Sequence, residues 1–350
     1  AVDSTWLFLK IIQVLNMTVM EVVYNGSVAA VAGALLYAVV VFAVRKWKLR
    51  AFRGPLPLPI VGNLWDPGAP MIITYLRKQS KIHGKMFAFW PGMTPYVVVA
   101  DKTAAREVLS DSKVFVKGSD YTEKFGVAFG EGLVTSNGET HKADRSCLGK
   151  YFIKNSIDAQ MSMFCEETKR MMNEAIEPHL GEAHDIQHFF HMLSLRVFGR
   201  LSISVDYGAP ENLKLAEAIN DGVKFGSNVI GESIVLNIPM SPLLPRVRKL
   251  RKVVKFIDDH MDDVIAARLE AMHRGEDTPD DVLAAMLADA QPRHKMHDQL
   301  RTLLSAGHDT TAFFGCYMAH LLAENPRVQE KLKEEVARVL AGRTDLTPQD

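Results

Sequence analysis

The sequence has little cysteine and no excess of charge. Its 350 residues include three cysteines, Cys147, Cys165 and Cys316, which are odd in number and far apart. Such a set predicts reduced thiols and excludes a disulfide framework or a cysteine-based zinc site. Lysine plus arginine and aspartate plus glutamate both number 41, so the formal net charge is +0. The charge balance therefore gives no electrostatic basis for a nucleic-acid partner.

Several catalytic motifs are also missing. The sequence contains no Gly-x-Ser-x-Gly nucleophile elbow, heptad pattern or tandem repeat. His308 and Asp309 are adjacent, so we expect them on different faces of a helix and not in a hydrolase triad. The glycine-rich segment 125–134 has no Gly-Lys-Ser/Thr ending, which excludes a phosphate-binding loop.

An apolar run near the N-terminus predicts a membrane anchor. Residues 28–44 carry no charged side chain and would span about 25 Å as a helix. Basic residues follow this run directly: Arg45, Lys46, Lys48, Arg50 and Arg53. The asymmetry predicts a transmembrane signal anchor, with residues 1–27 in the lumen and the long C-terminal part of the chain in the cytosol. A cleaved signal peptide, the alternative, would carry its basic residues before the run.

The expected lumenal segment has two further features. Asn16 and Asn25 each begin an Asn-x-Ser/Thr sequence, so both are potential glycosylation sites. Residues 6–23 are apolar but interrupted by polar side chains, which favours a segment lying along the membrane interface.

Residues 45–64 form a basic and proline-rich segment. Pro55, Pro57 and Pro59 stand at alternate positions, which forbids a helix and predicts a stiff, extended hinge. An ordinary linker is the alternative interpretation.

The remaining residues, 65–350, predict a mainly α fold with a small N-terminal β-sheet region. Residues 71–83 and 102–110 are predicted to be helices, and 87–90 and 96–99 a pair of strands. From residue 156 onward nearly every element is predicted to be a helix. Breaks are expected near Pro178, Pro210, residues 239–245 and Pro279.

The most informative segment is Ala306-Gly307-His308-Asp309-Thr310-Thr311, inside a long apolar helical run. Glycine costs a helix interior roughly 1 kcal/mol relative to alanine. Threonine hydroxyls can bond back to carbonyls of the preceding turn and bend the helix. A helix that accepts both is expected to pass close to a bulky group and to loosen its backbone for chemistry.

A second candidate site lies on the segment 139–145. His141 and Arg145 are four residues apart, so on a helix they point the same way and can hold one anion together. A solvated polar helix face is the alternative.

The segment 306–311, together with the upstream run 281–287 and the downstream run 321–336, resembles the distal helix and the next helix of the cytochrome P450 superfamily, the haem-thiolate monooxygenases. The resemblance implies a P450-like helical fold behind a single transmembrane helix, and it implies heme b. It places residues 65–350 in the N-terminal part of the catalytic domain.

The family also implies roles for individual residues. Asp309 would pass protons toward bound dioxygen, and Thr310 would hydrogen-bond that dioxygen and a water. Ala306 and Gly307 would keep side chains off the haem face. His141 and Arg145 would hold a haem propionate.

Four apolar residues would form substrate walls, three of them in the loop over the distal pocket: Phe125, Val127, Phe129 and Phe225. Ordinary packing of these side chains is the alternative.

None of the three cysteines has the family's ligand-loop context. We therefore expect the axial cysteine of the iron beyond residue 350, and no iron ligand within this chain. Glu335 and Arg338 match the pattern of the family's Glu-x-x-Arg motif, but they lie nearer the N-terminus than that motif does in the family. A surface pair at helical spacing is the preferred interpretation of these two residues.

The expected activity is insertion of one oxygen atom from O2 into a lipophilic substrate such as a sterol or fatty acid. Electrons would come from an NADPH-dependent reductase, with cytochrome b5 as a further candidate donor. The enzyme would be a single-pass protein of the endoplasmic reticulum membrane. The alternative is a truncated, catalytically silent relative that binds a lipid or a partner, and sequence beyond Asp350 would separate the two.

Overall fold

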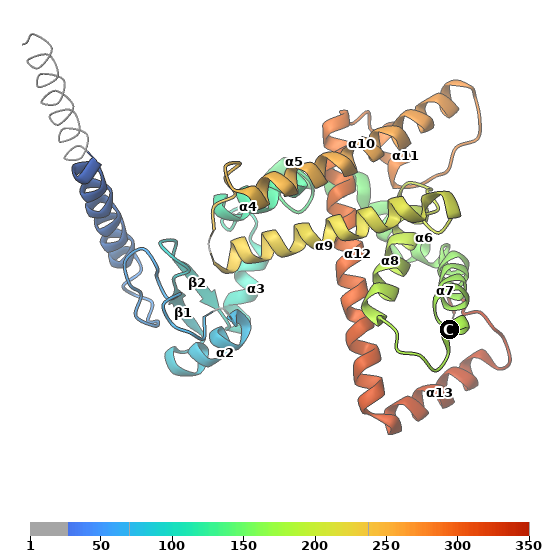
Figure 1. Cartoon of the computed structure of the whole chain (residues 1–350), viewed down its shortest axis with the longest axis horizontal. Helices are drawn as coiled ribbons and strands as arrows, with labels where there is room; N and C mark the ends of the chain where they lie inside the picture. Colours follow the sequence, from blue (N-terminus) through green and yellow to red (C-terminus); the bar gives the residue numbers. More distant parts are fainter. Residues whose placement is uncertain (1–26, 70, 237, 350) are drawn as a thin grey trace, which may run out of the picture. The chain divides into compact units, whose positions relative to one another are not determined.

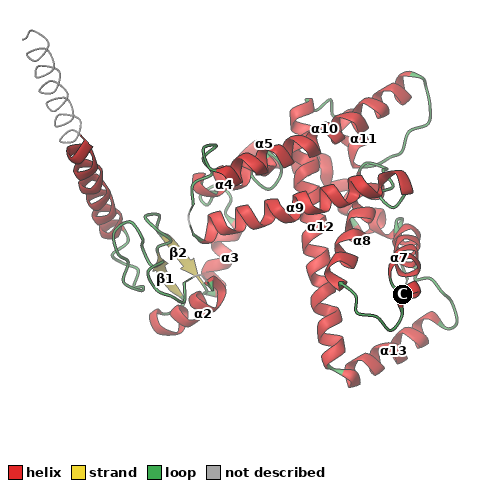
Figure 2. Cartoon of the chain, viewed as in Figure 1, coloured by secondary structure: helices red, strands yellow, loops and turns green. Residues whose placement is uncertain are grey.

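The computed structural model describes residues 27–69, 71–236 and 238–349. Asn16, Asn25 and the segment 6–23 lie outside these residues. The described chain is predominantly helical, with one small sheet (Figure 2). It divides into two compact units, residues 1–111 with 235–237, and residues 112–234 with 238–350.

The first unit contains a helix, Ser27–Lys48, that is long and apolar enough to cross a membrane. Only 6% of its most apolar window is buried. The helix continues past the predicted anchor 28–44, so the first residues of the expected hinge are helical. Near its end Phe42 packs on Trp90, with 5.3 Å between the ring centroids.

The proline-rich segment is not an extended spacer, so that prediction was wrong. It folds into turns around Asn63, which is completely buried. The Asn63 side chain accepts a hydrogen bond from the Trp90 backbone N–H at 2.8 Å and donates one to the Pro55 carbonyl at 3.2 Å. Because prolines lack a backbone donor, a buried amide that supplies both a donor and an acceptor can hold this segment against the sheet.

Two strands form the sheet. β1 (Met86–Phe89) pairs antiparallel with β2 (Tyr96–Val99), in a register that sets Met86 opposite Val99. Two helices flank the pair in sequence, α2 (Ile72–His83) and α3 (Lys102–Ser110). The predicted elements of this region are therefore confirmed to within a residue. α3 begins where the Asp101 carboxylate accepts the backbone N–H groups of Thr103 and Ala104.

The second unit is helical. Its α-helices are α4 (Ser119–Phe129), α5 (Gly138–Gly149), α6 (Lys154–Asp158), α7 (Met161–Ala175), α8 (Ile186–Ser202), α9 (Leu213–Val235), α10 (Pro245–His273), α11 (Val282–Ala288), α12 (Arg293–Glu324) and α13 (Pro326–Leu340). Short 3-10 turns occur at Lys150–Phe152, Glu177–His179 and Pro210–Asn212. The predicted breaks at prolines are confirmed, because Pro178 and Pro210 lie in such turns and Pro245 begins α10.

The core of this unit is the contact between α8 and α12, which lie side by side (Figure 1). Leu195 and Phe198 of α8 and Leu300 and Leu304 of α12 are buried in it. Gly315 permits the close approach, because a Cβ there would lie 2.5 Å from the Phe190 ring. A larger residue at 315 would force the two helices apart.

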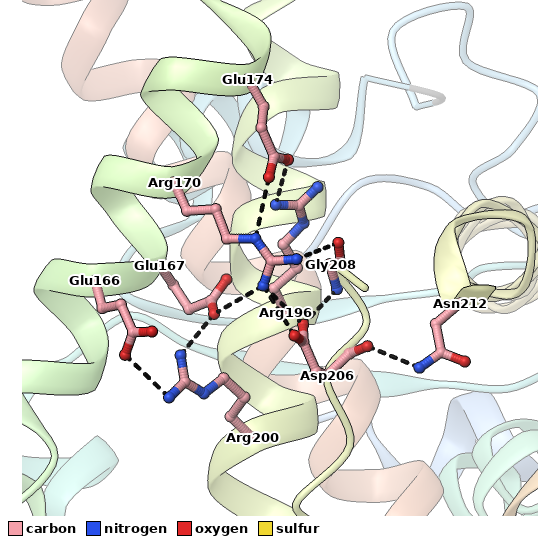
Figure 3. A network of polar contacts seen from close by, with 9 residues as sticks. All are labelled: Glu166, Glu167, Arg170, Glu174, Arg196, Arg200, Asp206, Gly208 and Asn212. Atoms are coloured by element: carbon pink, nitrogen blue, oxygen red, sulfur yellow. Dashed lines mark hydrogen bonds and ion pairs between the residues drawn. The ribbon is translucent and has the colours of Figure 1, made fainter. Parts of the chain in front are cut away.

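A network of arginines and carboxylates joins α7, α8 and the loop after α8 (Figure 3). The Arg200 guanidinium donates to Glu167 at 2.7 Å and to Glu166 at 3.1 Å. Arg170 pairs with Asp206 at 2.9 Å. Glu167 is completely buried, and its second carboxylate oxygen has no hydrogen-bond partner. Arg200 is therefore the main neutralising partner of a buried charge.

We expect Arg200→Met to lower the free energy of unfolding by about 2–3 kcal/mol, because it leaves the Glu167 charge buried with a weakened partner. Arg274→Met is the matched control, since Arg274 pairs with Glu276 on the surface, and it should leave the free energy of unfolding nearly unchanged because exposed ion pairs contribute little. Urea unfolding of both variants measures the difference. Equal losses would show that the network contributes no more than a surface ion pair.

Candidate active site on helix α12

The segment 306–311 lies within α12, which runs unbroken from Arg293 to Glu324. The Thr310 hydroxyl donates to the Ala306 carbonyl at 2.5 Å, which confirms the back-bond expected of a threonine here. Ala306, Gly307 and Thr310 are exposed. A Cβ at Gly307 would meet no atom within 4 Å, so this side of the helix is open.

An apolar cavity of about 570 Å³ adjoins the open side of the motif. Ala306, Gly307 and Thr311 form its α12 wall. The opposite walls come from α7 and α8, with Phe164, Phe190, Leu193, Val197 and Leu201 among the lining residues. The described residues that line it include no cysteine. Ala306 and Gly307, two small residues of α12, thus face a space of small-molecule size.

Asp309 lies in a different environment, half-enclosed by α8 and α9. The Ser227 hydroxyl donates to one of its carboxylate oxygens, and His308 Nδ1 lies 3.0 Å from the other. Burial raises the pKa of the Asp309 carboxyl, but the hydrogen bonds from His308 and Ser227 outweigh it and lower the pKa below its usual value. Asp309 is therefore ionised at neutral pH and oriented from two sides.

The expectation that His308 and Asp309 point to different faces was wrong. Their backbone positions do diverge around the helix, but both side chains are long enough to turn toward each other. His308 is completely buried against α8, where its carbonyl also accepts a hydrogen bond from Ser194 at 3.0 Å. The tertiary contact, which local spacing does not encode, selects this orientation.

Two residues of this site were missed by sequence reasoning. Ser227 comes from α9, and His191 comes from α8 with its Nε2 3.6 Å from an Asp309 carboxylate oxygen. His191 is completely buried. The sequence contained one indication of this site, a histidine inside the apolar run of α8, and it did not indicate which residue this histidine contacts.

His141 and Arg145 lie one turn apart on α5, as predicted. Burial lowers the pKa of His141, and the nearby charges of Lys117 and Arg145 lower it further. The Lys117 ammonium donates to the carbonyls of Leu133 and Ser136 at 3.2 and 2.7 Å. Three cationic or potentially cationic groups therefore gather at α5, which favours an anion there.

The loop between α4 and α5 is fastened to the start of α12. The backbone N–H of Glu131 donates to the Asp298 carboxylate and that of Leu133 to the Gln299 side chain, both at 2.9 Å. Lys295 pairs with the buried Asp144 of α5, also at 2.9 Å. These bonds fix the beginning of α5 relative to α12.

The four proposed substrate-wall residues, Phe125, Val127, Phe129 and Phe225, pack in one apolar cluster around α4, α9 and α10. The first three lie on helix α4, so the expectation of a loop at these positions was wrong. Phe129 also lines a small cavity of about 40 Å³ that Ser227 borders. The cluster therefore adjoins the Asp309 side of the site.

We expect Gly132→Ala to destabilise the unit by about 1–3 kcal/mol, because the added Cβ would lie 2.2 Å from the Thr302 hydroxyl and 2.5 Å from the Asp298 carbonyl. Gly231→Ala is the control, since a Cβ at this position in α9 meets nothing within 4 Å. Alanine should stabilise that helix by up to about 1 kcal/mol. Denaturant unfolding separates the two, and a neutral Gly132→Ala would contradict the close contact of the loop with α12.

The chain was compared with known proteins. The family model "Cytochrome P450" matches residues 52–350. Protein LUTEIN DEFICIENT 5, chloroplastic, from Arabidopsis thaliana is 27% identical over 75% of this chain and 46% of its own length. Pentalenene oxygenase from Streptomyces avermitilis is 25% identical over 83% and 63%, and cytochrome P450 2F2 from Mus musculus 27% identical over 82% and 61%. The chain thus spans between about half and two thirds of the length of these relatives.

Proposed function

The chain belongs to the cytochrome P450 family, which implies a haem cofactor, and we propose that the whole protein is a haem-thiolate monooxygenase acting on a lipophilic substrate. The observation that carries the proposal is the open Ala306–Gly307 surface of α12 beside an apolar cavity. When bound, the haem would supply activation of dioxygen with electrons from a reductase.

The residues present fit a haem. A flat apolar macrocycle needs a wall without projecting side chains, and Gly307 and Ala306 provide one. Its two propionates need cations and hydrogen-bond donors, and Lys117 and Arg145 lie near His141, whose neutral ring can donate a hydrogen bond. Because the described lining includes no cysteine, the proposal takes the thiolate ligand of the iron from outside these residues.

In this proposal Asp309 passes on protons, and Thr310 forms a hydrogen bond with a water on the side of the helix where oxygen would bind. Ser227 and His308 keep the Asp309 carboxylate ionised and in one orientation, so it can accept a proton from water and pass it on. The Thr310 hydroxyl gives its hydrogen to the Ala306 carbonyl, which leaves its oxygen lone pairs on the exposed side of the helix. It can therefore accept a hydrogen bond from a water there.

The proposed substrate class rests on the apolar residues expected to line the substrate pocket. Phe125, Val127, Phe129 and Phe225 offer apolar contact on the Asp309 side, which favours a lipophilic molecule such as a sterol or fatty acid. An NADPH-dependent reductase, with cytochrome b5 as a second donor, is the proposed partner. Basic residues at the end of the helix Ser27–Lys48 support a single-pass protein of the endoplasmic reticulum membrane with a cytosolic body.

Coupling of electron consumption to product tests the role of Thr310 in the whole protein with its reductase. Thr310→Ala should leave substrate binding nearly unchanged but divert electrons to hydrogen peroxide, because the hydroxyl that holds a water beside the oxygen is lost. Asp309→Asn should slow turnover by roughly 10-fold or more, because general acid–base catalysis usually contributes 10²–10⁴-fold.

Thr302→Ala is the matched control. Thr302 also bonds back to a carbonyl of α12, that of Asp298 at 2.7 Å, but it lies away from the motif. It should change the melting temperature and not the ratio of product to peroxide. If Thr310→Ala likewise changes only the melting temperature, Thr310 is a structural residue and the assignment is wrong.

A further inference from the structure

His191, His308 and Asp309 form a compact group within the described part of the chain. Each offers one ligand atom, and the three atoms lie within 4.8 Å of one another. The rings of His191 and His308 are 4.9 Å apart, and both side chains are completely buried. The proposed function uses Asp309 but assigns no task to His191.

The orientation of His191 is fixed by its other ring nitrogen. Nδ1 lies 2.7 Å from the Gln187 carbonyl, which can only accept, so Nδ1 carries the hydrogen. In the neutral ring Nε2 then presents a lone pair, and this atom is buried without a hydrogen-bond partner. A backbone carbonyl that holds one nitrogen while the other stays free is the usual arrangement of a metal-binding histidine.

Two acceptors therefore face each other in the group. His191 Nε2, which carries the free lone pair, lies 3.6 Å from an Asp309 carboxylate oxygen. Such a contact is unfavourable in a buried site unless a cation lies between the atoms.

Two of the three separations between the ligand atoms suit a zinc ion. Tetrahedral zinc with bonds of about 2.0–2.1 Å separates its ligand atoms by about 3.3 Å. His308 Nδ1 lies 3.0 Å and His191 Nε2 3.6 Å from the same Asp309 oxygen, which brackets that value. We propose that His191, His308 and Asp309 bind a divalent transition-metal ion such as Zn²⁺, distinct from the haem iron.

Charge and access agree with this proposal. Two neutral imidazoles and one carboxylate carry a net charge of about −1, which suits a dication. Asp309 is the least buried of the three, with 15% of its side chain accessible, so it forms the entry and leaves room for a water as fourth ligand. Ser227 donates to the second Asp309 oxygen and so orients the carboxylate. On binding, the proton of His308 would move from Nδ1 to Nε2, so that the ring stays neutral and Nδ1 presents its lone pair to the ion.

A second histidine among carboxylates provides the comparison. His297 lies 3.0 Å from Asp262 and 3.9 Å from Asp258. Those carboxylates are already neutralised by Arg293 and Arg301. A metal ion there would have to compete with two guanidinium groups, so His297 is a matched control.

Cobalt(II) titration of the tag-free chain in detergent tests the proposal, since tetrahedral cobalt has visible absorption bands that a hexahydrated ion lacks almost entirely. The wild-type chain should develop these bands, and added zinc should abolish them. His191→Gln should weaken cobalt binding by about 100-fold or more, because it removes a ligand. His297→Gln should bind as the wild type does.

Circular dichroism establishes that each variant is folded. If His191→Gln does not fold, Asp309→Asn is the second test. It keeps the shape of a less buried side chain, and it should show the same loss of cobalt affinity. Absence of the bands in the wild type, equal affinity in the ligand variants, or equal loss in His297→Gln would each overturn the proposal. The assay measures no turnover, so its outcome is independent of the monooxygenase proposal.

Discussion

The close contact between α8 and α12 is the constraint on which the rest of the second unit depends. It requires a glycine at position 315, where any Cβ would collide with Phe190. It also buries His308. It brings His191 within reach of Asp309, although these two residues are far apart in sequence. Since interiors are close-packed, a small displacement of either helix would separate these groups and alter the apolar cavity beside Gly307.

Polar side chains on α12 have two different roles at two places along the helix. Near the beginning, Asp298 and Gln299 accept backbone N–H groups of the loop before α5, and that loop positions the cationic residues of α5. Further along, Asp309 receives hydrogen bonds from Ser227 and His308. Burial raises the pKa of Asp298, whereas hydrogen bonds lower that of Asp309 despite its burial. Burial therefore decides the pKa of Asp298, and hydrogen bonds decide that of Asp309.

Local patterns predicted the elements well and their contacts poorly. The strands 86–89 and 96–99, helix α3 and the helix breaks at prolines follow from alternation, capping and the missing proline donor. The fold of the hinge does not, because it depends on one asparagine that bonds to a distant tryptophan backbone. Likewise, the α12 motif identified Asp309, but its partners on α8 and α9 are selected by packing and not by sequence spacing.

Asp309 and Thr310 show why neighbouring residues of one motif need different surroundings. A proton donor must be shielded enough for its ionisation to be set by fixed partners, which the enclosure by α8 and α9 provides. A hydroxyl that meets a small ligand must be accessible, and Thr310 lies on the open side beside Gly307. Successive helix positions are about 100° apart. A helix packed along one side can therefore bury the acid and expose the hydroxyl with no intervening residue.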